Sequence, residues 1–184
     1  MSPPSADAVP PPGRPRRSAL YMPAANPRAL AKAPDLACDV VILDLEDAVA
    51  PDAKAEARQA ACAAAAEGGF GAREVVIRIN GLTTEWGEAD LAAAAEARPD
   101  AILVPKINGP DDLGAYAQAL PEGVALWAMV ETCQVLFRLD ALGAAAKAHG
   151  LTTLVAGTND LAKEMGYRLD AQRAPLLAPL SLMV

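Results

Sequence analysis

Short apolar runs alternate with longer Ala-rich segments from Ser18 to the end of the chain. The apolar runs predict six strands, at residues 18–23, 40–47, 74–80, 101–107, 124–131 and 152–160. The segments between them are rich in Ala, Glu, Lys and Arg, which are strong helix formers. Regular alternation of strands and helices predicts βαβ units and a parallel sheet. The strands are almost continuous in apolar residues, which is typical of strands covered on both faces.

Two architectures fit this alternation, an open doubly wound sheet and a (β/α)8 barrel. Pro23 and Pro27 follow the first strand, where a doubly wound nucleotide-binding fold needs a Gly-rich turn. Nearly every predicted strand instead ends in a polar or charged residue, which favours a barrel with its active site at the carboxyl ends of the strands. We therefore predict an α/β fold of the (β/α)8 TIM-barrel type over residues 17–184, with about six of the eight βα units present. Since six strands cannot close a barrel, we expect a chain truncated at its C-terminal end.

Composition and charge define the class of protein. The chain has 184 residues, of which 53% are hydrophobic and 21% charged, and this predicts a globular protein with a sizeable core. A net charge of −7 argues against nucleic acid and anionic membranes as partners, and no apolar run approaches the roughly 20 residues that span a bilayer. Cys38, Cys62 and Cys133 fit neither a zinc site nor a disulfide framework, which indicates reduced thiols and a cytoplasmic location. The Pro-rich residues 1–16 predict a disordered tail without a secretory signal.

Polar side chains follow most of the predicted strands, and parallel strands bring them to one rim. They are Asp44, Glu46 and Asp47 after the second strand, Arg78 and Asn80 after the third, Lys106 after the fourth, Glu131 after the fifth, and Asn159 and Asp160 after the sixth. Glu131 and Asp160 follow neighbouring strands, which lie about 5 Å apart in a sheet. Two carboxylates this close repel each other unless a cation lies between them. Because oxygen ligands without His or Cys suit Mg²⁺, we predict a magnesium site at this pair.

Several of these residues also have a purely structural interpretation. Asp47 and Asp160 are placed where acids often cap a helix. Arg78 could form a structural ion pair with an acid of the second strand, and Lys106 could be a solvated loop lysine. The lone histidine, His149, precedes the sixth strand, so we expect it at the opposite rim, at a helix end or on the surface.

Six motifs occur in a fixed order along residues 16–184, and together they resemble the citrate lyase β-subunit (CitE-like) family of the HpcH/HpaI aldolase superfamily. The motifs are "RRSALYMPAANPRALAKA", "DVVILDLEDAVAPDAKAEAR", "VVIRINGLTTEWGEADLAA", "AILVPKI", "WAMVET" and "LVAGTNDLAKEMG". The resemblance implies a (β/α)8 barrel and a carbon–carbon lyase that uses Mg²⁺, with Mn²⁺ as a substitute. Such a lyase cleaves a 3-hydroxy-carboxyacyl-CoA of the citryl-, malyl- or citramalyl-CoA type to acetyl-CoA and a 2-oxo acid by retro-Claisen chemistry.

The family pattern also implies roles for single residues. The metal ligands would be Glu131 and Asp160, and the catalytic residues would be Arg78, Glu46 and Asp47. The substrate-binding residues would be Arg78, Asn80, Arg17, Arg28 and Lys32, the last three as contacts to the CoA phosphates. The implied partners are an acyl-CoA thioester and further copies of the chain, in a trimer or hexamer.

Two departures from the family pattern keep other functions open. Ala24 stands where the family usually has Gly after Pro, and the family's last two strands and its C-terminal acid, which acts in proton transfer, are not matched. One alternative is therefore a non-catalytic truncated barrel or an assembly subunit. Another is a class II pyruvate aldolase. That reaction needs a histidine base at the mouth of the barrel, and the lone histidine of this chain, His149, is badly placed for it. The exact thioester, and whether the outcome is cleavage or thioester hydrolysis, also stay open.

Overall fold

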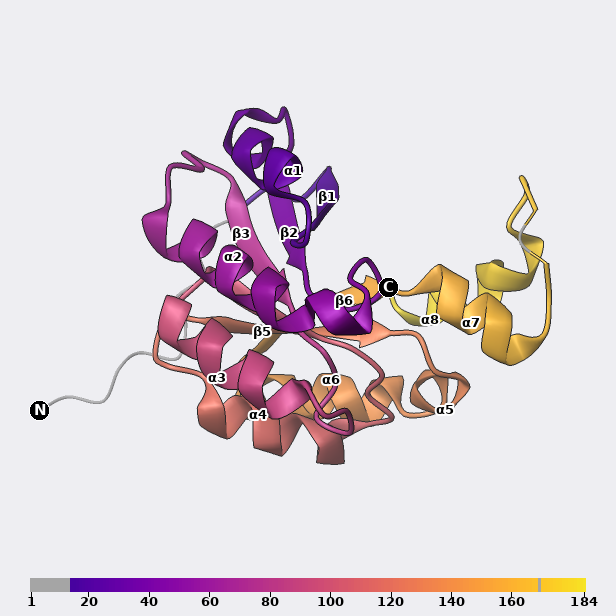
Figure 1. Ribbon diagram of the computed structural model, residues 1–184. Helices are drawn as coiled ribbons and strands as arrows, with labels where there is room; N and C mark the ends of the chain where they lie inside the picture. The colour runs from indigo at the N-terminus through magenta and orange to yellow at the C-terminus, as the bar shows by residue number, and fades with distance from the viewer. Residues whose placement is uncertain (1–13, 169) are drawn as a thin grey trace, which may run out of the picture.

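The computed structural model describes residues 14–168 and 170–184, and these residues form one curved parallel sheet covered by helices (Figure 1). The sheet has six strands in chain order, and every neighbouring pair is parallel. The strands are β1 Ala19–Pro23, β2 Val40–Asp44, β3 Glu74–Arg78, β4 Ala101–Val104, β5 Ala125–Val130 and β6 Leu151–Ala156. The predicted α/β fold and its six strands are confirmed. β1 and β6 are the two edges of the sheet, so the barrel is not closed.

At least one helix follows every strand. The α-helices are α1 Pro27–Lys32, α2 Lys54–Glu67, α3 Gly87–Ala97, α4 Leu113–Ala119, α5 Cys133–Leu136, α6 Leu139–His149, α7 Thr158–Met165 and α8 Leu177–Leu182. Helices α2, α3, α4 and α6 pack against one another in that order along the outer face of the sheet (Figure 1). Short 3₁₀ turns lie at Ala33–Asp35, Pro51–Ala53, Pro110–Asp112 and Ala174–Leu176. Within the described ranges, no helix has the length and apolar composition needed to cross a membrane.

The strands bury both of their faces, which explains their continuous apolar sequence. Val41 and Leu43 of β2 belong to a large cluster between the sheet and the outer helices. Val40 and Ile42 of the same strand point to the inner face, where they pack with Trp127 in a second, smaller cluster. Because successive strand residues point to opposite faces, each cluster takes every second position. The fold therefore has the layered core of a barrel wall rather than that of a one-sided sheet.

The predicted N-terminal tail is only partly described, because residues 1–13 lie outside the described ranges. Its last residues contact the amino ends of the strands. Arg14 pairs with Asp100 at 2.9 Å, and Arg16 pairs with Glu74 at 2.6 Å. The Arg16 guanidinium also stacks over the Trp127 ring, 4.7 Å from its centroid. These contacts therefore join the last residues of the predicted tail to the sheet.

Candidate active site

The carboxyl ends of the strands surround a cavity of about 440 Å³, and this cavity contains most of the predicted chemistry. Asp44, Asp47, Arg78, Glu131 and Asp160 all line it. A larger cavity of about 590 Å³ lies at the amino ends of the strands, lined by residues such as Arg14, Arg73 and Asp100. None of the predicted catalytic or metal-binding residues lines that larger cavity, so the smaller one is the candidate active site.

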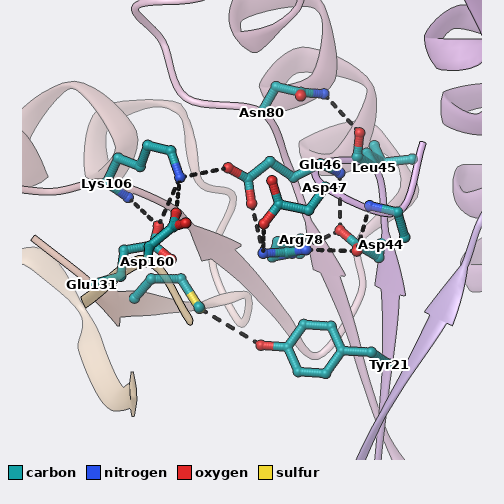
Figure 2. Close-up of polar contacts among 12 residues, drawn as sticks. Tyr21, Asp44, Leu45, Glu46, Asp47, Arg78, Asn80, Lys106, Glu131 and Asp160 are labelled. Carbon is teal, nitrogen blue, oxygen red and sulfur yellow. Dashed lines mark hydrogen bonds and ion pairs between the residues drawn. The ribbon is translucent and has the colours of Figure 1, made fainter. Parts of the chain in front are cut away.

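Arg78, the last residue of β3, is buried and holds three acids around its guanidinium (Figure 2). Its Nε and Nη2 donate to the two oxygens of Asp44 at 2.7 and 2.6 Å, which is a bidentate pair. Its Nη1 lies 2.6 Å from Glu46 Oε2 and 3.4 Å from Asp47 Oδ2. Burial by itself lowers the pKa of Arg78, but the hydrogen bonds and charges of Asp44 and Glu46 outweigh burial and raise it. The structural ion pair to the second strand therefore exists, and it lies inside the candidate site.

Asp44 also shapes the turn that carries the other two acids. Its Oδ1 accepts the backbone N–H of Glu46 at 2.9 Å, and its Oδ2 accepts that of Ala48 at 3.3 Å. These bonds fold the chain back after β2, so that Glu46 and Asp47 face Arg78 from the opposite side (Figure 2). Burial raises the pKa of Glu46, while the charges of Arg78 and Lys106 act in the opposite direction.

Asn80, predicted to bind substrate, does not line the cavity. Its amide is buried and fully bonded within the protein. Nδ2 donates to Leu45 O at 3.0 Å and to Asp90 Oδ2 at 2.5 Å, while Oδ1 accepts from the Lys54 ammonium at 2.8 Å. Asn80 is the second residue past Arg78, beyond the end of β3, and its partners Lys54 and Asp90 belong to the outer helices α2 and α3. There the buried Lys54 and Asp90 use its amide to fix the backbone that presents Glu46.

The predicted metal pair meets at the ammonium group of Lys106. Lys106 Nζ contacts Asp160 Oδ2 and lies 3.8 Å from Glu131 Oε1 and 3.3 Å from Glu46 Oε1 (Figure 2). The backbone N–H of Lys106 also donates to Glu131 Oε1 at 2.8 Å. Lys106 is half-exposed, but it is also paired with both predicted ligands, at the rim where its position after the fourth strand predicted it.

These residues fit a divalent cation, since a positive charge is already held between the two predicted ligands. Glu131 is 2% exposed, and burial raises its pKa, opposed by the N–H and the charge of Lys106. A buried carboxylate whose pKa is raised needs a nearby cation to remain charged. Among the residues that the structure describes, no group of three or more His, Cys, Asp or Glu side chains has an arrangement that could hold a metal ion by itself. Two carboxylates are nevertheless enough for Mg²⁺, which usually completes its coordination with water and substrate.

The sequence predicted Asp160 at the end of the sixth strand. In the structure β6 ends at Ala156 and α7 begins at Thr158. Asp160 therefore lies in the first turn of α7, and Gly157 makes the connection. A Cβ atom at Gly157 would lie 2.5 Å from Glu131 Cβ and 2.6 Å from Glu131 Oε2. Only glycine lets the β6–α7 turn approach Glu131 this closely. The G-x-x-D spacing in "GTND" was the sequence signal for this turn.

Gly157→Ala is expected to lower the free energy of unfolding by about 1–3 kcal/mol, because the new methyl group would overlap the buried Glu131 side chain. Urea denaturation of the variant and the parent measures the difference. Gly143→Ala in α6 is the matched control, since its methyl group would meet no atom within 4 Å. Replacing a mid-helix Gly by Ala should stabilise the protein by about 0.5–1 kcal/mol. Equal effects of the two substitutions would contradict a tight Gly157–Glu131 contact.

The three basic residues flanking β1 do not lie together. Arg17 precedes β1 and bonds to Asp39 at the amino end of β2, with Nη2 to Oδ1 at 2.8 Å. Arg17 therefore lies at the opposite end of the strands from the cavity, apart from the other two basic residues. Arg28 and Lys32 are exposed residues of α1, which follows the carboxyl end of β1, and neither lines the cavity. Their contact to the CoA phosphates stays a prediction.

Tyr21 is a further site residue that the sequence argument missed. It lies in β1, lines the cavity, and its ring centroid is 5.1 Å from the Arg78 guanidinium carbon. Its hydroxyl donates to the sulfur of Met129 at 3.6 Å (Figure 2). Burial raises the pKa of Tyr21 to about 12, so the hydroxyl is neutral at physiological pH. Nothing in "SALYMP" distinguishes a cavity tyrosine from one that packs in the core.

Comparison with known proteins gives one consistent result. The family described as HpcH/HpaI aldolase/citrate lyase matches residues 17–180. A (3S)-malyl-CoA thioesterase of Cereibacter sphaeroides is 46% identical over 168 residues, which cover 91% of this chain and 58% of that protein. An L-malyl-CoA/β-methylmalyl-CoA lyase of the same species is 33% identical over 86% of this chain and 53% of that protein. This chain thus spans a little over half the length of these relatives.

The fold agrees with solved structures. A citrate lyase β subunit from M. tuberculosis, in complex with oxaloacetate and magnesium, superimposes with a TM-score of 0.72 at 28% identity. The superposition covers 90% of this chain and 70% of that one. The six βα units described above therefore have the arrangement of a citrate lyase β-subunit barrel, as the sequence predicted.

Proposed function

This chain belongs to the HpcH/HpaI aldolase/citrate lyase family, and on that premise we propose that it acts on a 3-hydroxy-carboxyacyl-CoA thioester of the malyl-CoA type with the help of a divalent cation. The reaction proposed is carbon–carbon cleavage to acetyl-CoA and a 2-oxo acid. The observation that carries the proposal is one arrangement at the strand ends. A buried Arg78, clamped by Asp44, faces the same cavity as the Glu131–Asp160 pair.

Thioester hydrolysis is the second candidate reaction. The relative with 46% identity is named a malyl-CoA thioesterase, whereas a lyase of the same species is 33% identical. Both names share the substrate class and differ in the bond that is broken. We place cleavage first because retro-Claisen chemistry needs the fixed cation and the metal-binding acids that converge here.

Arg78 would supply a fixed positive charge beside the reacting atoms. Its pKa is raised above the already high value of an ordinary arginine, so the guanidinium keeps its proton during the reaction. Asp44 holds two of its nitrogens, which fixes the plane of the guanidinium while one face still borders the cavity. A charge that is oriented before the reaction stabilises the developing enolate oxygen without reorganisation. A divalent cation bound by Glu131 and Asp160 would polarise the substrate oxygens as a Lewis acid.

Glu46 is the candidate for proton transfer within this chain. Burial raises its pKa, which favours the protonated form that an acid in proton transfer needs. Its two oxygens lie near Arg78 Nη1 and Lys106 Nζ, so its position is fixed from both sides. Asp47, whose side chain is 65% exposed, is the other acid at the mouth and is open to solvent. Arg28 and Lys32, which are exposed on α1, would contact the CoA phosphates.

Incubation with malyl-CoA and Mg²⁺ tests the proposal and separates the two reactions. Cleavage releases glyoxylate and acetyl-CoA, whereas hydrolysis releases malate and free CoA thiol. We expect glyoxylate formation that stops when the metal is removed with EDTA. Thiol release without glyoxylate would instead establish the thioesterase. Pyruvate release from a 4-hydroxy-2-oxo acid, without CoA, would favour the class II aldolase, and no reaction with any of these would favour a non-catalytic assembly subunit.

A further inference from the structure

Lys106 has an unusual position for a lysine at the mouth of a cavity. Its ammonium group lies among three carboxylates, contacting Asp160 and lying 3.3 Å from Glu46 and 3.8 Å from Glu131 (Figure 2). Its backbone has a left-handed conformation with φ of 52°, which is rare for a residue other than glycine. That conformation directs the Lys106 N–H to Glu131 Oε1 at 2.8 Å. Strained backbone of this kind is concentrated at functional sites.

The lysine and the acids differ strongly in their exposure to solvent. The side chain of Lys106 is 52% exposed, whereas those of Glu131 and Glu46 are 2% and 10% exposed. Glu131 and Glu46 are therefore fixed in the protein, while Asp160 is 32% exposed. The ammonium reaches them from the solvent on a flexible four-carbon chain. Moving the ammonium back into water requires only rotation of that chain. Moving Glu131 would disturb the buried turn around Gly157.

The same carboxylate oxygens cannot serve the ammonium and a metal ion at once. Glu131 and Asp160 are the two groups proposed to hold the divalent cation, and both face Lys106 Nζ. Two cations sharing these oxygens would repel each other strongly at such short distances. Glu46 lies on the other side of the ammonium, nearer to Arg78, and is not one of the proposed ligands.

We propose that Lys106 is the internal counter-ion of the metal-free site, and that a divalent cation displaces its ammonium from Glu131 and Asp160. This inference rests on the metal site of the proposed function. Lys106 stabilises the acids while no metal is bound, and it lowers the apparent metal affinity, because only the fraction of molecules with the ammonium displaced can bind. After displacement the ammonium stays beside Glu46, at the edge of the cavity.

Titration with Mn²⁺, followed by EPR, tests the competition in the parent chain and in Lys106→Met. Methionine keeps the length of the side chain and removes the charge. We expect the variant to bind Mn²⁺ at least about 10-fold more tightly, since the competing cation is gone. Lys147→Met is the matched control, because Lys147 is an exposed residue near the end of α6, and its affinity should equal that of the parent. Lys106→Arg, which keeps the charge, should bind no more tightly than the parent.

Two further measurements distinguish displacement from a long-range effect of charge. Without metal, Lys106→Met should melt at a lower temperature than the parent, and saturating Mn²⁺ should reduce this difference. Mn²⁺ should also increase the rate at which an acetylating reagent labels Lys106, measured by mass spectrometry, with no change at Lys147. A Lys106→Met variant with unchanged or weaker Mn²⁺ binding, in a parent that does bind Mn²⁺, would overturn the counter-ion while leaving the metal site intact. Absence of Mn²⁺ binding in both chains would overturn the counter-ion and the proposed metal site together.

Discussion

Replacing Arg78 with Met is expected to lower the free energy of unfolding by about 3–5 kcal/mol, because it removes one partner of a buried ion pair. Arg78 is 6% exposed and Asp44 is 1% exposed, so the Asp44 carboxylate would be left in the interior without its bidentate partner. Glu46 would lose its contact to Arg78 Nη1 at the same time. Methionine has nearly the volume of arginine's aliphatic part, so the loss reports charge more than a cavity. Urea denaturation followed by circular dichroism measures the change.

Arg138→Met is the matched control for this experiment. Arg138 Nη2 pairs with Asp111 Oδ2 at 2.7 Å, but the two side chains are 36% and 80% exposed. An ion pair in contact with solvent contributes about 0–1 kcal/mol, so the control should stay close to the parent. Similar losses in the two variants would mean that the Arg78 cluster is solvated and contributes no more than a surface pair. Asp44→Asn should reproduce most of the Arg78→Met effect, since it breaks the same pair from the other side.

Much of the fold follows from the sequence, because strand periodicity does not depend on distant contacts. The run "VVILD" is apolar on both faces, and β2 indeed buries all of its five residues. Parallel strands place their ends at one rim, and this rule alone brought Arg78, Asp47 and Glu131 to the same cavity. The boundary of β6 was wrong, because the turn at Gly157 and the helix that follows depend on packing against Glu131 rather than on local periodicity.

The direction of individual side chains was less predictable. Asn80 follows Arg78 in the same motif, yet its amide is taken up by Lys54 and Asp90, which are distant in sequence. Lys106 is exposed over half of its side chain and still pairs with three acids, a combination that residue type alone does not reveal. Arg17 directly precedes the first predicted strand, so the rule that places His149 at the opposite rim also places Arg17 there, beside Asp39. The sequence thus predicts which residues lie at each end of the strands. The hydrogen-bond and ion-pair partners of each side chain require the three-dimensional structure.

Glu131→Gln is expected to weaken Mn²⁺ binding by roughly 100-fold or more, because it removes a charged metal ligand. Groups that only orient metal ligands already change affinity by about 10–100-fold, so loss of a charged ligand oxygen should exceed that range. The fold should survive, because the glutamine carbonyl can still accept the Lys106 N–H that now bonds to Glu131 Oε1. Burial raises the pKa of Glu131 and thus disfavours its charged form in the protein, so a neutral amide carries no added cost of burial.

EPR titration with Mn²⁺ measures the affinity, and Glu88→Gln serves as the matched control. The Glu88→Gln substitution is the same chemical change at an exposed position in the first turn of α3, and Glu88 does not line the cavity. Asp160→Asn should lose binding as Glu131→Gln does, since the two carboxylates face one cation. Parent-like affinity in Glu131→Gln would remove Glu131 from the metal site and leave it as a buried partner of Lys106 alone. Loss of binding in all three variants would instead show that Mn²⁺ responds to the overall negative charge of the chain, so only loss confined to Glu131 and Asp160 supports a defined site.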